Sequence, residues 1–171
     1  MPTETVDKAV LARLEDPVYG LNAVLEALSA ARGIEDIDLV DFSVESGQYY
    51  NTRLDPSQVL ASGRRTFPVV TSAVVSFTDQ ANSHTLFSGL VTVAFQVMLT
   101  SSQSQPPDRW GDILNLWMDS FVRVMNDPNA GQLALGLAYG GNISGAASAL
   151  IVDAENWLSV LNFSIDVLVD L

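Results

Sequence analysis

The chain has 171 residues, of which 48% are hydrophobic and 16% are charged, with a net charge of −12 and no cysteine. This length fits a single domain, residues 1–171, that buries most of its apolar surface without the help of disulfides or metals. The lack of cysteine excludes disulfides, thiol chemistry and cysteine-based zinc sites. A surface this acidic repels nucleic-acid phosphates, whereas the surplus of apolar over charged residues predicts an interface between subunits.

The start of the chain, MPTETVDKAV, carries neither a basic segment nor an apolar core, and therefore does not resemble a signal peptide. No uncharged apolar run approaches the roughly 18 residues that a membrane span needs. We therefore expect a protein that does not enter membranes and that resides or assembles in the cytosol.

Two amphipathic helices are predicted before the first strand. Apolar residues recur at helical spacing over residues 5–14, and Asp16 followed by Pro17 is typical of a helix N-cap and first position. The second helix is expected to reach about Ala31 and to be ended by Gly33. Its buried face would carry Val18, Leu21, Leu25 and Leu28.

Strict alternation of apolar and polar residues predicts the strands. The clearest case is residues 85–101, where Val91, Val93, Phe95, Val97 and Leu99 share one side. Residues 66–78 are predicted to pair with it as a long hairpin. A strand over residues 39–44 comes first, and a short strand over residues 149–152 precedes a long closing strand that starts at Trp157.

A third long helix is predicted from the N-cap Asp108 to about Met125, with an apolar stripe that would cover the buried face of the hairpin. The stripe consists of Trp110, Ile113, Leu114, Trp117, Phe121, Val124 and Met125. Residues 131–145 are rich in glycine and predict no element. The expected fold is α+β, with a largely antiparallel sheet of about four to five strands, a long central hairpin, N-terminal helices and one mid-chain helix.

Catalysis and metal binding are not indicated. His84, the only histidine, flanks a predicted turn and has no serine, cysteine or carboxylate motif attached to it. The acidic residues between Glu35 and Glu45 lack the spacing of a calcium loop and fit a solvated edge. We expect no enzyme activity, no cofactor and no metal.

The polar segment of residues 47–65 is the predicted partner interface. It concentrates three of the eight basic residues, and tyrosine beside arginine is enriched in protein interfaces. Asp55 and Pro56 predict one helical turn inside it. The interface residues would be Tyr49, Tyr50, Arg53, Arg64 and Arg65, which could reach the acidic residues 35–45 of a neighbouring subunit. A merely solvated loop, or one that faces DNA, is the alternative.

This order of elements resembles the tail terminator proteins of long-tailed phages. The likeness rests on N-terminal helices before a strand, the strand start Phe67-Pro68, a long hairpin followed by a helix, and a closing strand introduced by Trp157. The resemblance implies a homo-oligomeric ring, usually a hexamer, that caps the tail tube of the virion. One face would meet the tail tube protein and the other a head-completion or stopper protein. Genomic DNA would pass through the lumen without sequence-specific binding.

Two other interpretations stay open from the sequence. The chain could be another ring component of the tail or neck, either a tube subunit or a connector adaptor. It could also be a small ligand-binding α+β domain, which would need polar groups that converge in an apolar pocket.

Overall fold

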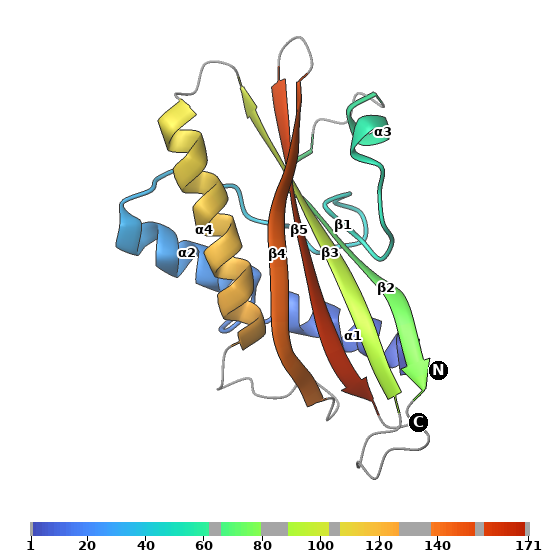
Figure 1. Ribbon diagram of the computed structural model, residues 1–171. Coiled ribbons are helices and arrows are strands. Elements are labelled where there is room, and N and C mark those ends of the chain that lie inside the picture. The colour runs from blue at the N-terminus through green and yellow to red at the C-terminus, as the bar shows by residue number, and fades with distance from the viewer. Residues whose placement is uncertain are drawn as a thin grey trace.

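The computed structural model describes residues 2–61, 66–79, 89–102, 107–126, 138–152 and 156–169 (Figure 1). Its elements, in chain order, are α1 (Pro2–Leu14), α2 (Leu21–Arg32), β1 (Tyr49–Tyr50), α3 (Pro56–Ala61), β2 (Val69–Asp79), β3 (Gly89–Ser102), α4 (Pro107–Asn126), β4 (Ala138–Val152) and β5 (Asn156–Val169). The strands form one open sheet in the order β1-β2-β3-β5-β4. Only β1 and β2 pair in parallel. The expected α+β class with a mostly antiparallel sheet is confirmed.

Strand β3 occupies the centre of the sheet, as its alternation predicts. It pairs antiparallel with β2 on one side and with β5 on the other, where the register runs from Gly89 opposite Val169 to Ser102 opposite Asn156. The side chains of Val91, Val93, Phe95 and Val97 are fully buried. The predicted hairpin pairing is therefore confirmed, and the closing strand lies antiparallel beside the central strand.

Helices cover both faces of the sheet, but unequally. Helices α1, α2 and α4 lie on one face and α3 on the other (Figure 1). The first face forms the main core, to which these three helices contribute Val10, Leu21 and Phe121 among others. The opposite face carries a smaller second cluster of Val59 from α3 with Val69, Met98, Leu158 and Val160 from the sheet.

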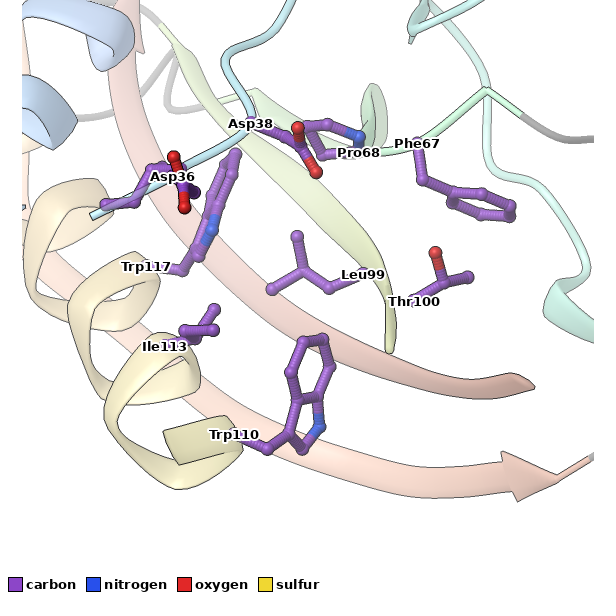
Figure 2. A pocket seen from close by; sticks show the side chains of 10 residues that line it. Asp36, Asp38, Phe67, Pro68, Leu99, Thr100, Trp110, Ile113 and Trp117 are labelled. Atoms are coloured by element: carbon purple, nitrogen blue, oxygen red, sulfur yellow. The ribbon is translucent and has the colours of Figure 1, made fainter. Parts of the chain in front are cut away.

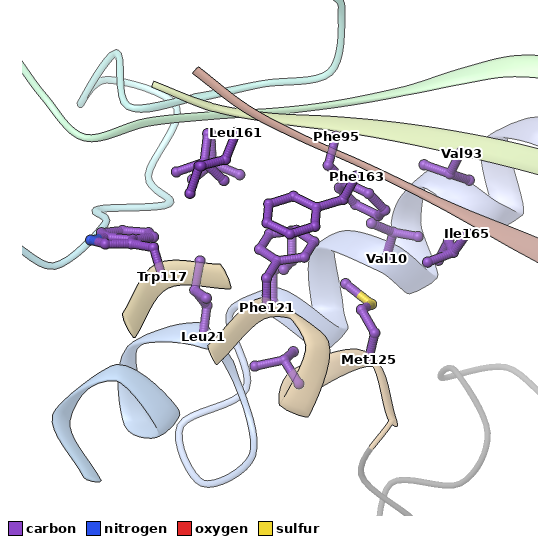
Figure 3. Close-up of a cluster of buried hydrophobic side chains, with 14 of the residues drawn as sticks. Val10, Leu21, Val93, Phe95, Trp117, Phe121, Met125, Leu161, Phe163 and Ile165 are labelled. Carbon is purple, nitrogen blue, oxygen red and sulfur yellow. The ribbon is translucent and has the colours of Figure 1, made fainter. Parts of the chain in front are cut away.

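Aromatic rings fill the centre of the main core. Phe121 of α4 stacks on Phe163 of β5, with ring centroids 4.4 Å apart, and meets Phe95 of β3 edge-on at 5.0 Å (Figure 3). Trp117 lies one turn earlier on the same side of α4, as the apolar stripe of this helix predicts. The stripe therefore binds α4 to two neighbouring strands at once.

A buried arginine joins α1 to the end of α4. The guanidinium of Arg13 donates from Nε and Nη2 to the carbonyl oxygen of Val124, at 2.9 and 2.5 Å. That carbonyl belongs to the last turn of α4, where backbone acceptors have no partner within the helix. Arg13 is only 7% exposed, so it caps α4 from inside the protein.

The second helix starts later than the sequence predicts. Oδ1 of Asp16 accepts the backbone N–H groups of Val18 and Tyr19, each at 2.8 Å, and so it closes a turn. Helix α2 begins after Gly20, and Val18, expected on the buried face, is 64% exposed. An N-cap residue followed by proline fits such a turn as well as a helix. The end of the helix at Gly33, with φ of 64°, is as predicted.

The predicted strand over residues 39–44 is wrong. The backbone N–H and C=O of Val40 bond to the side-chain amide of Asn22 on α2, which occupies the groups that a neighbouring strand would need. Oδ1 of Asp41 accepts the N–H of Ser43 and turns the chain, so that Val44 is 99% exposed. The first strand is instead β1, inside the segment expected to be a loop.

Two further boundaries differ from the sequence-based prediction. Strand β4 covers 15 residues from Ala138, whereas a short strand over residues 149–152 was expected. Its glycine, alanine and serine residues give no alternation to detect, and pairing with β5 holds it through two irregularities. Helix α4 starts at Pro107, so Asp108 lies in its first turn and is not its N-cap. The predicted one-turn helix after Asp55 is present as α3.

Candidate functional site

The two tyrosines of the predicted interface are built into the fold. They form β1, and their side chains go to opposite sides of it. Tyr49 packs against the main core, with its hydroxyl 2.6 Å from Oγ of Ser72 and its ring 5.6 Å from that of Phe42. Burial raises the pKa of Tyr49 above its usual value. Tyr50 packs against the second cluster. Neither tyrosine is a freely exposed interface side chain.

Arg53 is the exposed member of the predicted set within the described residues. It directly precedes Leu54, which packs on the second cluster and donates its N–H to Oε1 of Gln96 at 3.0 Å. Arg64 and Arg65 lie outside the described residues, as does His84. The structure therefore places Leu54, the neighbour of Arg53 in the arginine-bearing segment (residues 47–65), on the α3 face of the sheet.

The acidic segment, residues 35–45, lies on the other face. Ile34 and Ile37 pack against the main core, while Glu35, Asp36, Asp38, Asp41 and Glu45 are exposed. The hydrogen bond from the N–H of Ser43 lowers the pKa of Asp41. Among the described residues, no group of three or more histidine, cysteine, aspartate and glutamate side chains is placed to hold a metal ion.

A pocket of about 210 Å³ opens beside the acidic segment (Figure 2). Helix α4 supplies one wall with Trp110, Ile113 and Trp117, which recur on one side of the helix. The other walls come from three more segments: Asp36, Ile37 and Asp38; Phe67 and Pro68; and Leu99 and Thr100. The indole N–H of Trp110 donates to Oγ of Ser159 at 3.1 Å, which fixes the orientation of the ring.

Sequence reasoning missed this pocket because four distant segments must meet to form it. The apolar stripe predicts that both tryptophans lie in the core, and both are nearly buried. The signal available in the sequence was the pair of aspartates at positions 36 and 38, which were assigned to a solvated edge.

A second hollow, of about 250 Å³, lies between α1 and β1. Asp7 lines it and accepts a hydrogen bond from Nδ2 of Asn51 at 3.3 Å, while its Oδ1 is buried without a partner among the described residues. Burial raises the pKa of Asp7. The neighbouring Lys8 pairs with Glu4 at 2.7 Å in an exposed contact. This arrangement offers no nucleophile with a base beside it.

In comparisons with known proteins, no protein-family model matches the chain and no curated protein matches it. In the described part of the structure, none of the helices has the length and apolar character that crossing a membrane requires.

Proposed function

We propose that this chain is the subunit of a phage tail terminator, a ring that caps the tail tube and joins it to the head-completion complex. The ring would contain several copies, six by the resemblance, and DNA would pass through its lumen without specific binding. In this role the protein is a structural component of the virion at the tail–neck junction and not an enzyme.

The observation that carries this proposal is that the acidic segment and Arg53 lie on different faces of the sheet. The acidic segment packs on the face of the sheet that α4 covers, and Arg53 lies beside Leu54 on the face that α3 covers (Figure 1). Contacts between two different sites that attract one another favour head-to-tail association, because each copy then meets the next through the opposite site. If the rotation between neighbouring copies brings the last copy back to the first, such contacts form a closed ring.

The edges of the sheet give independent support for self-association. Among the described residues, strand β4 ends the sheet on one side, and on the other β1 pairs only with Val70 and Thr71 of β2. Beyond that pairing, the edge strand β2 exposes apolar side chains, with Val75 45% and Phe77 43% exposed. Exposed apolar edges in a soluble protein are commonly covered by a partner.

Charge reversal in the arginine-bearing segment tests the contact. Arg64→Glu together with Arg65→Glu is expected to weaken ring assembly or joining to the tube, because like charges would then face the acidic segment of the next copy. The circular dichroism of the subunit should stay unchanged. Assembly is measured by light scattering and negative-stain imaging at low and physiological salt, with tube present and absent.

A matched pair of single variants makes the test specific to this segment. Arg53→Glu should weaken assembly, whereas Arg123→Glu, at an arginine that is also exposed but lies in the last turn of α4, should not. Normal assembly of the double variant at both salt concentrations would show that the segment is not an interface.

Another ring component, a tube subunit or a connector adaptor, is the alternative from the same machinery. The sheet edges, which have no further strand beside them in the described part of the chain, fit a tube subunit as well. The position of the protein on the tail distinguishes the two functions. A terminator binds the head-proximal end of a finished tube, whereas a tube subunit polymerises along its length.

A further inference from the structure

We propose that the pocket between α4 and the acidic segment binds a positively charged side chain, arginine or lysine, of a protein partner. This proposal rests on the pocket alone and requires neither a ring nor a phage tail.

The first argument is the chemistry of the walls. Trp110 and Trp117 line the pocket with Leu99 between them, and Phe67 lines it with its ring turned away from the tryptophans (Figure 2). Aromatic rings attract cations through their electron-rich faces, and aliphatic and aromatic walls suit the methylene stem of lysine or arginine. Because Ser159 holds the indole of Trp110, this wall is in place before anything binds.

The second argument is the charge at the rim. The carboxylates of Asp36 and Asp38 line the same pocket, and both residues are exposed. Within the described part of the chain, neither carboxylate has a hydrogen-bond or ion-pair partner. Asp36 has a positive φ of 59°, an unusual backbone conformation for a residue with a side chain. Two unpaired carboxylates favour a cation and repel an anion.

The third argument is size. A volume of about 210 Å³ is smaller than the roughly 300–1,000 Å³ that is usual for small-molecule sites, but it accommodates one side chain. The pocket is open to the surface, so that a partner can insert such a side chain from outside. The net charge of −12 also favours a basic partner surface.

Arg109, a positively charged residue of the chain itself, should lower the affinity of the pocket for a cation. Arg109 precedes Trp110 and donates from Nη2 to the carbonyl oxygen of Glu35 at 3.1 Å, which holds its charge beside the pocket. Its guanidinium does not line the pocket. It repels an incoming cation, and therefore Arg109→Gln should strengthen binding.

The test is a titration of the whole protein with the peptide acetyl-Gly-Arg-Gly-amide, followed by NMR of the assigned indole N–H signals of Trp110 and Trp117. A matched peptide carries citrulline, which has nearly the shape of arginine without its charge. The arginine peptide is expected to shift both signals, and the citrulline peptide neither. Asp36→Asn with Asp38→Asn should weaken binding by about fivefold or more.

A second double variant controls for net charge. Glu26→Gln with Glu45→Gln removes the same two charges at exposed positions that do not line the pocket, and it should bind like the unchanged protein. Equal shifts with citrulline, or full binding by the Asp36/Asp38 variant, would overturn the proposal. Binding of tetramethylammonium without binding of the peptide would also contradict it, because the site would then serve a free ammonium ligand.

Discussion

Replacing Phe121 by alanine is expected to lower the free energy of unfolding by about 3–5 kcal/mol. Phe121 is fully buried and contacts the rings of Phe95 and Phe163 on the two central strands. The substitution removes these contacts and leaves a cavity where α4 meets the sheet. Strands cannot close that cavity easily, since their pairing fixes the distance between them.

The measurement is denaturant and thermal unfolding beside a control from the next position. Val122→Ala removes apolar atoms from the same helix at a residue that is 39% exposed, and it should change stability by much less. For a chain of this size each kcal/mol corresponds to about 2–4 °C in melting temperature. Similar stability for the two variants would show that Phe121 does not hold the core as the structure has it.

Replacing Arg13 by methionine is expected to cost about 1.5–3 kcal/mol, because it leaves the carbonyl of Val124 buried without the charged donor. Methionine keeps much of the apolar stem, so the loss reports mainly on the hydrogen bonds. Arg13 also brings a positive charge to the C-terminal end of α4, where it interacts favourably with the partial negative charge of the helix dipole.

Two companion variants define the role of Arg13. Lysine should recover part of the stability, since it keeps the charge but lacks the planar fork that gives two bonds to one oxygen. Arg123→Met, at an exposed arginine of the same helix, should have little effect. If Arg13→Met and Arg123→Met unfolded at the same denaturant concentration, the buried cap would contribute nothing.

The parts of the fold that the sequence predicts are those with strong periodicity. The alternation around Phe95 identifies the central strand, and the apolar stripe around Trp117 identifies α4 and its buried side. In both cases the pattern is the direct consequence of having one buried face. The closing strand follows from the same signal, whereas its pairing with the central strand is known from the structure.

The errors arise where tertiary contacts decide the local structure. Residues 39–44 alternate like a strand, but Asn22 satisfies the backbone of Val40 and Asp41 turns the chain. Strand β4 shows no alternation of apolar and polar residues, and it is held in the sheet by its pairing with β5. Tyr49 and Tyr50, predicted in a loop, form the two-residue strand β1 and pack partly against the two clusters, because so short a strand cannot be detected from sequence.

The proposed tail terminator ring is tested most directly by negative-stain imaging of the purified protein, alone and mixed with cognate tail tubes. The account predicts a ring with a central hole, seated at the head-proximal end of the tube when tubes are present. A protein that stays monomeric at high concentration and leaves both tube ends bare would contradict it.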